Sequence, residues 1–244
     1  MMEIGASIFF TEYSISPAEL GVALEERGFD SLWVAEHSHI PVTRRFSPPG
    51  GGELTRQYYN VMDPFVTLSV VAAVTKRLKL ATGVCLVPQR DTIQTAKLVA
   101  SIDQISGGRF IFGIGGGWNT EEMEDHGTVY ATRFKRMREQ IEAMKEIWTN
   151  EKAEYHGDLI DFAPMMTWPK PVQQPHPPLI VGGAFQYAAR RAIRYGDGLI
   201  PQAPDAGSGA VEEYLPRFRR MARRSRPRPG LAAGDPRRRS GEPR

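Results

Sequence analysis

Two apolar segments of this 244-residue chain end in glycines, at positions where a ligand could bind. One segment reads Arg109-Phe-Ile-Phe-Gly-Ile-Gly-Gly-Gly-Trp-Asn119, and the other reads Pro175-His-Pro-Pro-Leu-Ile-Val-Gly-Gly-Ala184. Glycine lets the backbone come close to a ligand, and backbone amides at such points often bind phosphate. We therefore expect a ligand site where these two segments end.

His37 is the best candidate for proton transfer. It ends a short apolar segment, Ser-Leu-Trp-Val-Ala-Glu-His37, which we expect to form a strand. A histidine titrates near neutral pH, so at a strand end it can donate or accept a proton. Side chains alternate along a strand, so Glu36 should point the opposite way. The alternative is a structural histidine bonded to the sheet, but the position favours a functional role.

Two other kinds of site fit the sequence less well. His37 and His39 have the spacing of a metal-binding pair, but the later strand ends carry no further ligands, so no metal is expected. The run Gly113-Ile-Gly115-Gly116-Gly117-Trp118 departs from the dinucleotide-binding pattern, because Trp118 takes the place of its third glycine. Trp118 could pack on a planar ring or simply fill the core.

The rest of the sequence alternates expected strands with expected helices, which predicts parallel strand pairing. Strands are expected at 3–10, 31–37, 78–87, 109–114, 178–183 and 197–201. Helices are expected from the Ser16 cap to Gly28 and at 64–75, 92–106, 133–149 and 187–195. A TIM barrel needs eight strands in roughly 250 residues. The sequence therefore predicts an α/β fold, a TIM (β/α)8-type barrel that is incomplete, with about six strands.

Three segments interrupt this pattern. The loop at 38–60 is long enough to act as a lid, and the segment at about 150–177 is expected to hold a hairpin around Gly157 and Asp158. Residues 217–244 are rich in arginine, proline and glycine, with few apolar residues to offset the entropy of ordering. We expect one domain at 1–216 and a disordered tail at 217–244.

Charge and composition narrow the functional class. The tail at 217–244 carries eleven arginines and two acidic residues, so the net charge of +3 leaves the first 216 residues at −6. Nucleic-acid binding is therefore not expected. No apolar run is long enough for a membrane span, and no secretory signal is evident, so a cytoplasmic protein is expected. Cys85, the single cysteine, lies in an apolar segment and should be buried and unreactive.

Taken together, these segments resemble the luciferase-like monooxygenase superfamily, and within it the coenzyme F420-dependent oxidoreductases. The resemblance runs from the N-terminus to about Pro201, with the final strands of such a barrel missing. The matching pieces are Gly28-Phe-Asp-Ser-Leu-Trp-Val-Ala-Glu-His37, Leu80-Ala-Thr-Gly-Val84, Ser106-Gly-Gly-Arg-Phe110, Gly113–Asn119 and Pro169-Lys-Pro-Val-Gln-Gln-Pro-His-Pro-Pro-Leu-Ile-Val-Gly-Gly183.

The resemblance implies a barrel that holds a flavin or deazaflavin at the C-terminal ends of its strands. Gly83 and Val84 would form a bulge, often with a non-proline cis peptide, that supports the ring. His37 would lie near the reactive centre. The other implied cofactor contacts are Gly115, Gly116, Gly117, Trp118 and Asn119 beside the ring, and Gly182, Gly183 and Ala184 along the cofactor tail or its phosphate. Some relatives carry a glutamate where this chain has Trp118, so that acid role is not carried over.

The resemblance therefore implies an oxidoreductase that transfers a hydride between reduced coenzyme F420, an 8-hydroxy-5-deazaflavin, and a small organic substrate. A monooxygenase that uses flavin mononucleotide (FMN) is the alternative within this class. A metal-dependent barrel hydrolase and an inactive remnant of a longer protein are the alternatives outside it. A small-molecule substrate and a possible homodimer are the expected partners, without nucleic acid or membrane.

Overall fold

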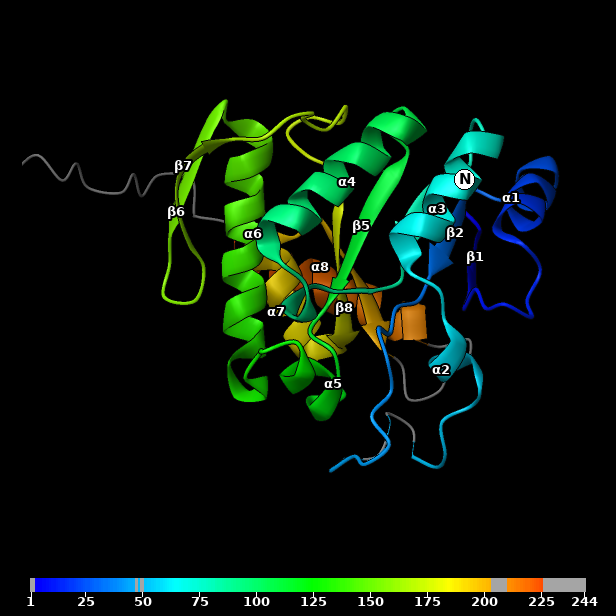
Figure 1. Ribbon diagram of the computed structural model, residues 1–244, viewed down its shortest axis with the longest axis horizontal. Coiled ribbons are helices and arrows are strands. Elements are labelled where there is room, and N and C mark those ends of the chain that lie inside the picture. The colour runs from blue at the N-terminus through cyan, green and yellow to red at the C-terminus, as the bar shows by residue number, and fades with distance from the viewer. Residues whose placement is uncertain (1–2, 47, 49–50, 203–209, 226–244) are drawn as a thin grey trace, which may run out of the picture. The chain divides into compact units, whose positions relative to one another are not determined.

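The computed structural model describes residues 3–46, 48, 51–202 and 210–225 (Figure 1). The chain divides into two compact units, Met1–Ala206 and Gly207–Arg244. The first unit contains the sheet and all five helices that the sequence predicts. Among the described residues, no helix combines the length and the apolar character needed to cross a membrane.

A curled parallel sheet forms the centre of the first unit. Its strands follow the order β1 (Gly5–Ile8), β2 (Ser31–Val34), β3 (Lys79–Thr82), β5 (Phe110–Gly115), β8 (Leu179–Ala184) and β9 (Gly198–Gln202). Every neighbouring pair is parallel, and the two-residue strand β4 (Cys85–Leu86) also pairs with β5. This path of six strands confirms the expected α/β fold, in the form of a half-barrel.

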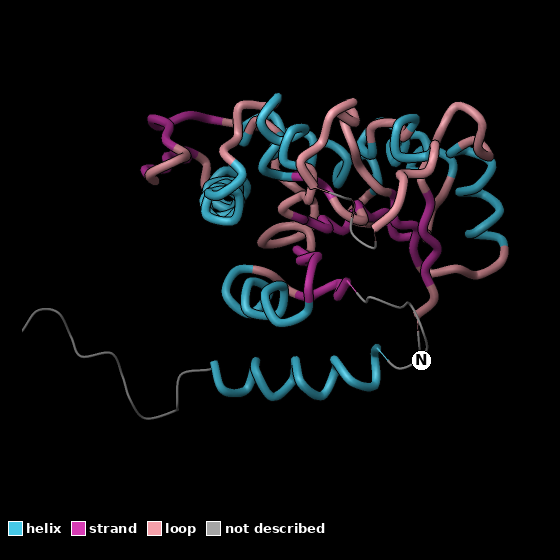
Figure 2. The backbone as a smooth tube through the Cα atoms, turned by 90° about the horizontal axis from the view of Figure 1, so that it is seen from below, coloured by secondary structure: helices cyan, strands magenta, loops and turns pink. Residues whose placement is uncertain are grey.

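Helices line the outer side of this curve (Figure 2). They are α1 (Pro17–Glu26), α3 (Pro64–Val74), α4 (Thr92–Ser106), α6 (Arg133–Thr149) and α7 (Phe185–Tyr195), and each contacts the next in chain order. Two short helices, α2 (Gln57–Asn60) and α5 (Thr120–Asp125), and 3₁₀ turns at Val87–Gln89 and Tyr130–Thr132 lie in the connections. The antiparallel hairpin β6 (Lys152–His156) and β7 (Asp161–Met166) lies beside α6, which confirms the hairpin expected around Gly157 and Asp158 (Figure 1).

Capping residues set where the long helices begin. Ser16 accepts a hydrogen bond from the Glu19 amide, and the Glu19 side chain accepts one from the Ser16 amide, which completes a capping box. Asp63 and Asp91 cap α3 and α4 with side-chain oxygens that accept hydrogen bonds from backbone amides of the first turn. Helix α4 ends at Gly107, whose φ of 65° is the left-handed conformation that favours glycine. These signals explain why the helix boundaries could be predicted closely.

Aromatic side chains fill the space between the sheet and helices α3, α4 and α6. Phe110 and Phe112 of β5 are fully buried, and Phe65 of α3 lies 6.0 Å from the Phe110 ring centroid. Trp148 of α6 meets Phe112 edge-on at 6.2 Å, and its indole N–H donates to the Ala96 carbonyl at 3.0 Å. Strand β5 is thereby fixed against three helices, so the glycines at its end have a defined position.

The structure corrects two expected boundaries. The strand expected at 78–87 is two strands, β3 and β4, because Gly83 and Val84 interrupt it with a cis peptide bond. The second correction concerns the tail: α8 spans Ala210–Ser225, so residues 217–225 are helical and the expected domain boundary at 216 falls inside a helix. Tyr214, Phe218 and Met221 recur at helical spacing and are each half-buried, which gives α8 an amphipathic side. Residues 226–244 of the expected tail lie outside the described part.

Candidate functional site

The candidate site lies at the edge of the sheet where β2, β3, β5 and β8 end. The strands are parallel, so their C-terminal ends meet at one edge, which is where barrel enzymes place their active sites. His37 follows β2, Gly83 and Val84 follow β3, Gly115 to Asn119 close β5, and Gly182 to Ala184 close β8. The residues expected from the sequence therefore share one edge.

Val84 follows β3, and its side chain packs against the ends of β5 and β8. A Cβ placed on Gly115 would lie 2.5 Å from Val84 Cγ2, and one placed on Gly182 would lie 2.8 Å from Val84 Cγ1. Both glycines therefore leave room for the valine that follows the Gly83–Val84 cis peptide. The bulge expected at Gly83 and Val84 is present, and Gly115 and Gly182 serve first to accommodate it.

The other glycines differ in what they face. A Cβ on Gly116 would meet the Phe134 ring at 2.4 Å, so this glycine makes room for α6. Gly117 has a φ of 71° and turns the chain towards α5. Gly183 has a φ of 129°, and a Cβ placed there meets nothing within 4 Å. Ala184 next to it is exposed. The end of β8 is therefore the part of the glycine-rich edge that stays open.

His37 is held by a buried carboxylate. Its Nδ1 lies 2.8 Å from Oε2 of Glu122 in α5, and the two side chains are 6% and 0% exposed. The other Glu122 oxygen accepts a hydrogen bond from the Ser38 amide at 2.9 Å. Nδ1 of His37 donates to the carboxylate. Nε2 makes no hydrogen bond to the residues that the structure describes, so it can exchange a proton with a bound molecule. This geometry gives His37 a defined tautomer and orientation.

The charge on Glu122 is stabilised by its partners. Burial by itself raises the pKa of this carboxyl, but the hydrogen bond and charge of His37, together with the Ser38 amide, hold the pKa below its ordinary value of 4.5. Glu122 is therefore ionised at neutral pH and acts as a hydrogen-bond acceptor towards His37 and the Ser38 amide.

Replacing Glu122 by glutamine is expected to destabilise the protein at neutral pH by about 1.5–3 kcal/mol, the contribution of hydrogen bonds to a charged group. A lowered folded-state pKa stabilises the protein above the unfolded value of 4.5, and this stabilisation is lost as the pH falls further. The gap between wild type and Glu122→Gln in urea unfolding should therefore shrink below pH 4.5. A gap independent of pH would contradict the assigned charge.

Two aromatic rings contact His37. The Trp118 ring meets it edge-on with centroids 5.8 Å apart, and the Tyr58 ring lies 5.5 Å away. Trp118 is half-buried at the site, so it is not the plain core residue that the sequence left as an alternative. Tyr58 belongs to α2, within the loop expected to act as a lid. The loop and the β5 end thus both reach the same histidine.

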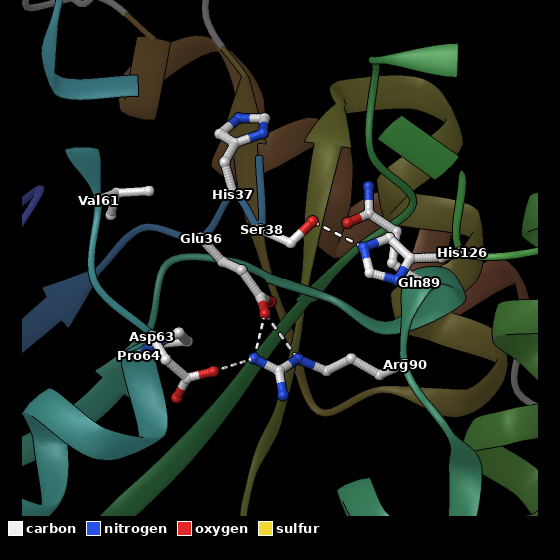
Figure 3. A pocket seen from close by; sticks show the side chains of 9 residues that line it. All are labelled: Glu36, His37, Ser38, Val61, Asp63, Pro64, Gln89, Arg90 and His126. Carbon is white, nitrogen blue, oxygen red and sulfur yellow. Dashed lines mark hydrogen bonds and ion pairs between the residues drawn. The ribbon is translucent and has the colours of Figure 1, made fainter. Parts of the chain in front are cut away.

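A cavity of about 350 Å³ opens beside His37 (Figure 3). It is lined by Glu36, His37, Ser38, Val61, Asp63, Pro64, Gln89, Arg90 and His126. The glycines at the ends of β5 and β8 do not line it. In Figure 3 the side chains of Glu36 and His37 point in opposite directions, as strand alternation predicts.

One wall of this cavity is an ion-pair network. Glu36 is buried and accepts hydrogen bonds from the Leu86 amide and from Arg90 Nε, both at 2.6 Å. Arg90 also reaches Asp63 at 2.6 Å (Figure 3). The network joins the ends of β2 and β4 to the start of α3. Cys85 beside it is fully buried, and burial raises the pKa of its thiol well above 9.0, so it fits the expected unreactive cysteine.

His39 lies apart from His37 and has different partners. Its Nε2 lies 2.9 Å from Asp125, and its Nδ1 lies 2.9 Å from the Ser38 hydroxyl, which also contacts His126. Within the described ranges, no group of three or more histidine, cysteine, aspartate or glutamate side chains could hold a metal ion. His37 and His39 thus bind different carboxylates, and the Ser38 hydroxyl, 3.3 Å from Glu122 Oε1, links the two groups.

Asn119 has an unusual environment for an amide. The residue is 1% exposed, yet neither its side-chain nitrogen nor its oxygen has a hydrogen-bond partner in the described structure. It precedes α5 without capping it. A buried polar group without a partner costs free energy, so such a group at a site often awaits a ligand. Asn119 is the predicted binding residue with the strongest physical evidence for that role.

Two residues of the site were missed by sequence reasoning. Glu122 is the main one, because the acid was sought directly after the glycines, where Trp118 stands. Glu122 follows Trp118 by four residues and lies in the first turn of α5, and an acidic residue in the first turn of a helix was a signal that could have been used. Arg90 comes from a segment whose position depends on tertiary packing, so no local pattern marks it.

Comparisons with known proteins find several similar chains. A family model described as luciferase-like monooxygenase matches residues 16–237. An uncharacterized protein of Mycobacterium tuberculosis is 41% identical over 199 residues, which cover 78% of this chain and 70% of that protein. Among solved structures, the monooxygenase RslO1 from Streptomyces bottropensis is similar with a TM-score of 0.73 and 25% identity, over 91% of this chain and 66% of RslO1.

Two relatives with named activities use different cofactors. The FMNH2-dependent dimethylsulfone monooxygenase of Pseudomonas putida is 35% identical over 136 residues, covering 54% of this chain and 37% of the enzyme. The F420-dependent glucose-6-phosphate dehydrogenase of Amycolatopsis mediterranei is 29% identical over 194 residues, covering 75% of this chain and 51% of the enzyme. This chain therefore spans about half or less of the length of these two enzymes.

Proposed function

Because this chain belongs to the luciferase-like monooxygenase family, we propose that it acts as an oxidoreductase that transfers a hydride between reduced coenzyme F420 and a small organic substrate. Family members use either F420 or FMN. The observation that carries the proposal is the buried His37–Glu122 pair, which lies at the edge of the sheet beside a cavity. Such a pair suits proton transfer during two-electron chemistry.

The residues at the strand ends fit a flat, polar-edged ring. Val84 would lie under the ring, and the orphaned amide of Asn119 offers one donor and one acceptor to it. The open backbone at Gly183 and the exposed Ala184 leave space for the cofactor tail. A reduced deazaflavin supplies a hydride when it is bound, while the protein supplies binding and orientation.

The chain's own part in the reaction rests on three groups. Glu122 keeps the His37 ring in one tautomer, so Nε2 exchanges a proton with the substrate atom that gains or loses one. Trp118 and Tyr58 pack against the same ring and limit access of water to it. The network of Glu36, Arg90 and Asp63 shapes the neighbouring wall.

An FMN-dependent monooxygenase is the second candidate. It is supported by the 35% identity to the FMNH2-dependent enzyme of Pseudomonas putida, although that match covers less of the chain than the match to the F420-dependent enzyme. Both candidates use the same edge of the sheet and the same histidine. They differ in which cofactor the chain binds.

Thermal unfolding with each cofactor tests the proposal. A ligand that binds only the folded state at about 100 times its Kd stabilises it by about 2.7 kcal/mol. We expect coenzyme F420 to raise the Tm by several degrees, and FMN to raise it less. A larger shift with FMN would favour the monooxygenase. A well-folded protein that is stabilised by neither cofactor would refute both candidates.

In the same experiment, Asn119→Leu is expected to stabilise the ligand-free protein, whereas most substitutions of buried residues destabilise it. Leucine has a similar volume and no polar atoms, so the ligand-free variant should be about 1 kcal/mol more stable than wild type, because an unpaired amide is removed. The Tm shift with cofactor should shrink or disappear. As a control, Thr128→Val removes a buried hydroxyl that donates to the Pro88 carbonyl at 2.6 Å. This control should lower stability and leave the cofactor shift unchanged.

A further inference from the structure

A second cavity, separate in its lining from the His37 cavity, lies between α6 and α7. Its volume is about 370 Å³, within the range of small-molecule sites. Five cationic side chains and one phenol line it: Lys135, Arg138, Arg190, Arg191, Arg194 and Tyr195. The Phe134 ring also borders it. On a body whose first 216 residues carry a net charge of −6, this local excess of cations stands out.

Local carboxylates neutralise only part of this charge. Lys135 pairs with Asp158 and lies 3.9 Å from Glu139, and Arg138 lies 3.4 Å from Glu142. In contrast, Arg190, Arg191 and Arg194 of α7 form no ion pair within the described part of the chain. Three guanidinium groups thus share one cavity without a carboxylate partner. Like charges repel at short range, so such a cluster is stabilised by an anion.

Arg191 is held in place, unlike a freely moving surface arginine. Its guanidinium carbon lies 3.5 Å from the centroid of Phe134, whose ring also stacks with Arg133 at 4.3 Å. Burial, with a contribution from the neighbouring Arg133 charge, lowers the pKa of Arg191. The buried Nε of Arg133 has no hydrogen-bond partner among the described residues. The Arg191 guanidinium is therefore positioned in advance by the Phe134 ring, at the border of the cavity.

Tyr195 provides a separate indication of a ligand. It lines the same cavity and is 7% exposed, yet its hydroxyl makes no hydrogen bond within the described structure. Burial raises the pKa of this phenol to about 12, so the group stays a neutral donor at physiological pH. A buried hydroxyl beside three unpaired arginines can donate to the same anion.

We propose that the cavity between α6 and α7 binds a phosphate group of a small molecule, through Arg191, Arg190, Arg194 and the hydroxyl of Tyr195. The planar guanidinium forks of the arginines match the oxygens of phosphate in pairs, and the charge of the group offsets their repulsion. The phosphate can belong to a free metabolite or inorganic phosphate, or to a bound cofactor that carries one. This proposal does not depend on the cofactor proposed for the His37 site.

Titration with inorganic phosphate tests the site in the full chain. Isothermal titration calorimetry at constant ionic strength, balanced with chloride, should show saturable binding to the wild-type protein. Arg191→Gln should raise the Kd by about 10- to 100-fold, the effect of losing charge-assisted hydrogen bonds. The double variant Arg190→Gln/Arg194→Gln changes two exposed side chains without ion pairs, so it should also weaken binding and still fold.

Arg77→Gln is the matched control, because it removes one exposed arginine beyond the end of α3 and should leave the Kd unchanged. Repeating the titration with riboflavin or FMN present distinguishes the two sources of phosphate. Competition by FMN alone assigns the cavity to a cofactor phosphate, and no competition by either assigns it to a separate ligand. No saturable binding to wild type, or an equal loss in Arg77→Gln, would overturn the site.

Discussion

Replacing His37 by glutamine is expected to lower kcat by about 10² to 10⁴, the usual contribution of a positioned acid or base. Glutamine keeps a polar side chain of similar length and can still face Glu122, so the fold and cofactor binding should persist. The single-turnover rate with the cofactor identified by thermal unfolding gives the measurement. Loss of the rate with an unchanged cofactor Kd would place His37 in the chemical step.

Glu122→Gln separates catalysis from positioning. The carboxylate acts through His37, so its loss should reduce the rate by about 10- to 100-fold, less than the loss of the histidine. In the His37→Gln background the same change should have little further effect, because groups that act as one unit are not additive. If the rate losses of the two single variants simply add in the double variant, His37 and Glu122 do not act as one unit.

Much of the fold could be predicted because its signals are local. The Ser16 box, the Asp63 and Asp91 caps and the left-handed Gly107 each mark a helix boundary within a few residues. The order of strands and helices then favours a parallel sheet. The split of the third strand could not be read from apolar content, because Leu78–Val87 is apolar on both sides of the cis peptide.

The tail shows where composition misled. Arginine and proline dominate 217–244, and this content suggested disorder, whereas α8 runs through Pro216 to Ser225. The spacing of Tyr214, Phe218 and Met221, four and then three residues apart, carried the helical signal, but these three apolar residues lie within a charged background. For this helix, the spacing of apolar residues was a better predictor than the arginine and proline content.

The site also has some residues that local sequence patterns predict and others that depend on contacts between distant segments. His37 and the glycines could be found because each closes a strand, and strand ends meet at one edge. Glu122, the partner of His37, lies 85 positions away in the sequence. Such a pair depends on how the connections between strands and helices fold. The roles of Gly115 and Gly182 were expected to be cofactor contacts. The structure assigns them a packing role towards Val84 as well.

Gly113→Ala is expected to have the largest effect on stability, a loss of about 3 kcal/mol or more, at the upper end for overpacking in a core. A Cβ at this position would lie 1.9 Å from the Thr82 carbonyl oxygen. That oxygen belongs to the backbone of β3, and the Thr82 hydroxyl donates to the Gly113 carbonyl at 2.6 Å, so neither strand can yield without losing bonds. Urea unfolding should show a much lower midpoint or an unfolded protein.

Gly115→Ala is the matched comparison, because the residue lies on the same face of the same strand. Its added Cβ would meet a methyl group of Val84, 2.5 Å away, and a side chain can move where a backbone carbonyl cannot. We expect a smaller loss, about 1 kcal/mol, which Val84→Ala should partly relieve by removing the opposing methyl group. The same Val84→Ala change should not rescue Gly113→Ala. Equal losses in the free energy of unfolding for Gly113→Ala and Gly115→Ala would show that strand β5 shifts freely. The assumption that the sheet holds a rigid edge at the site would then be wrong.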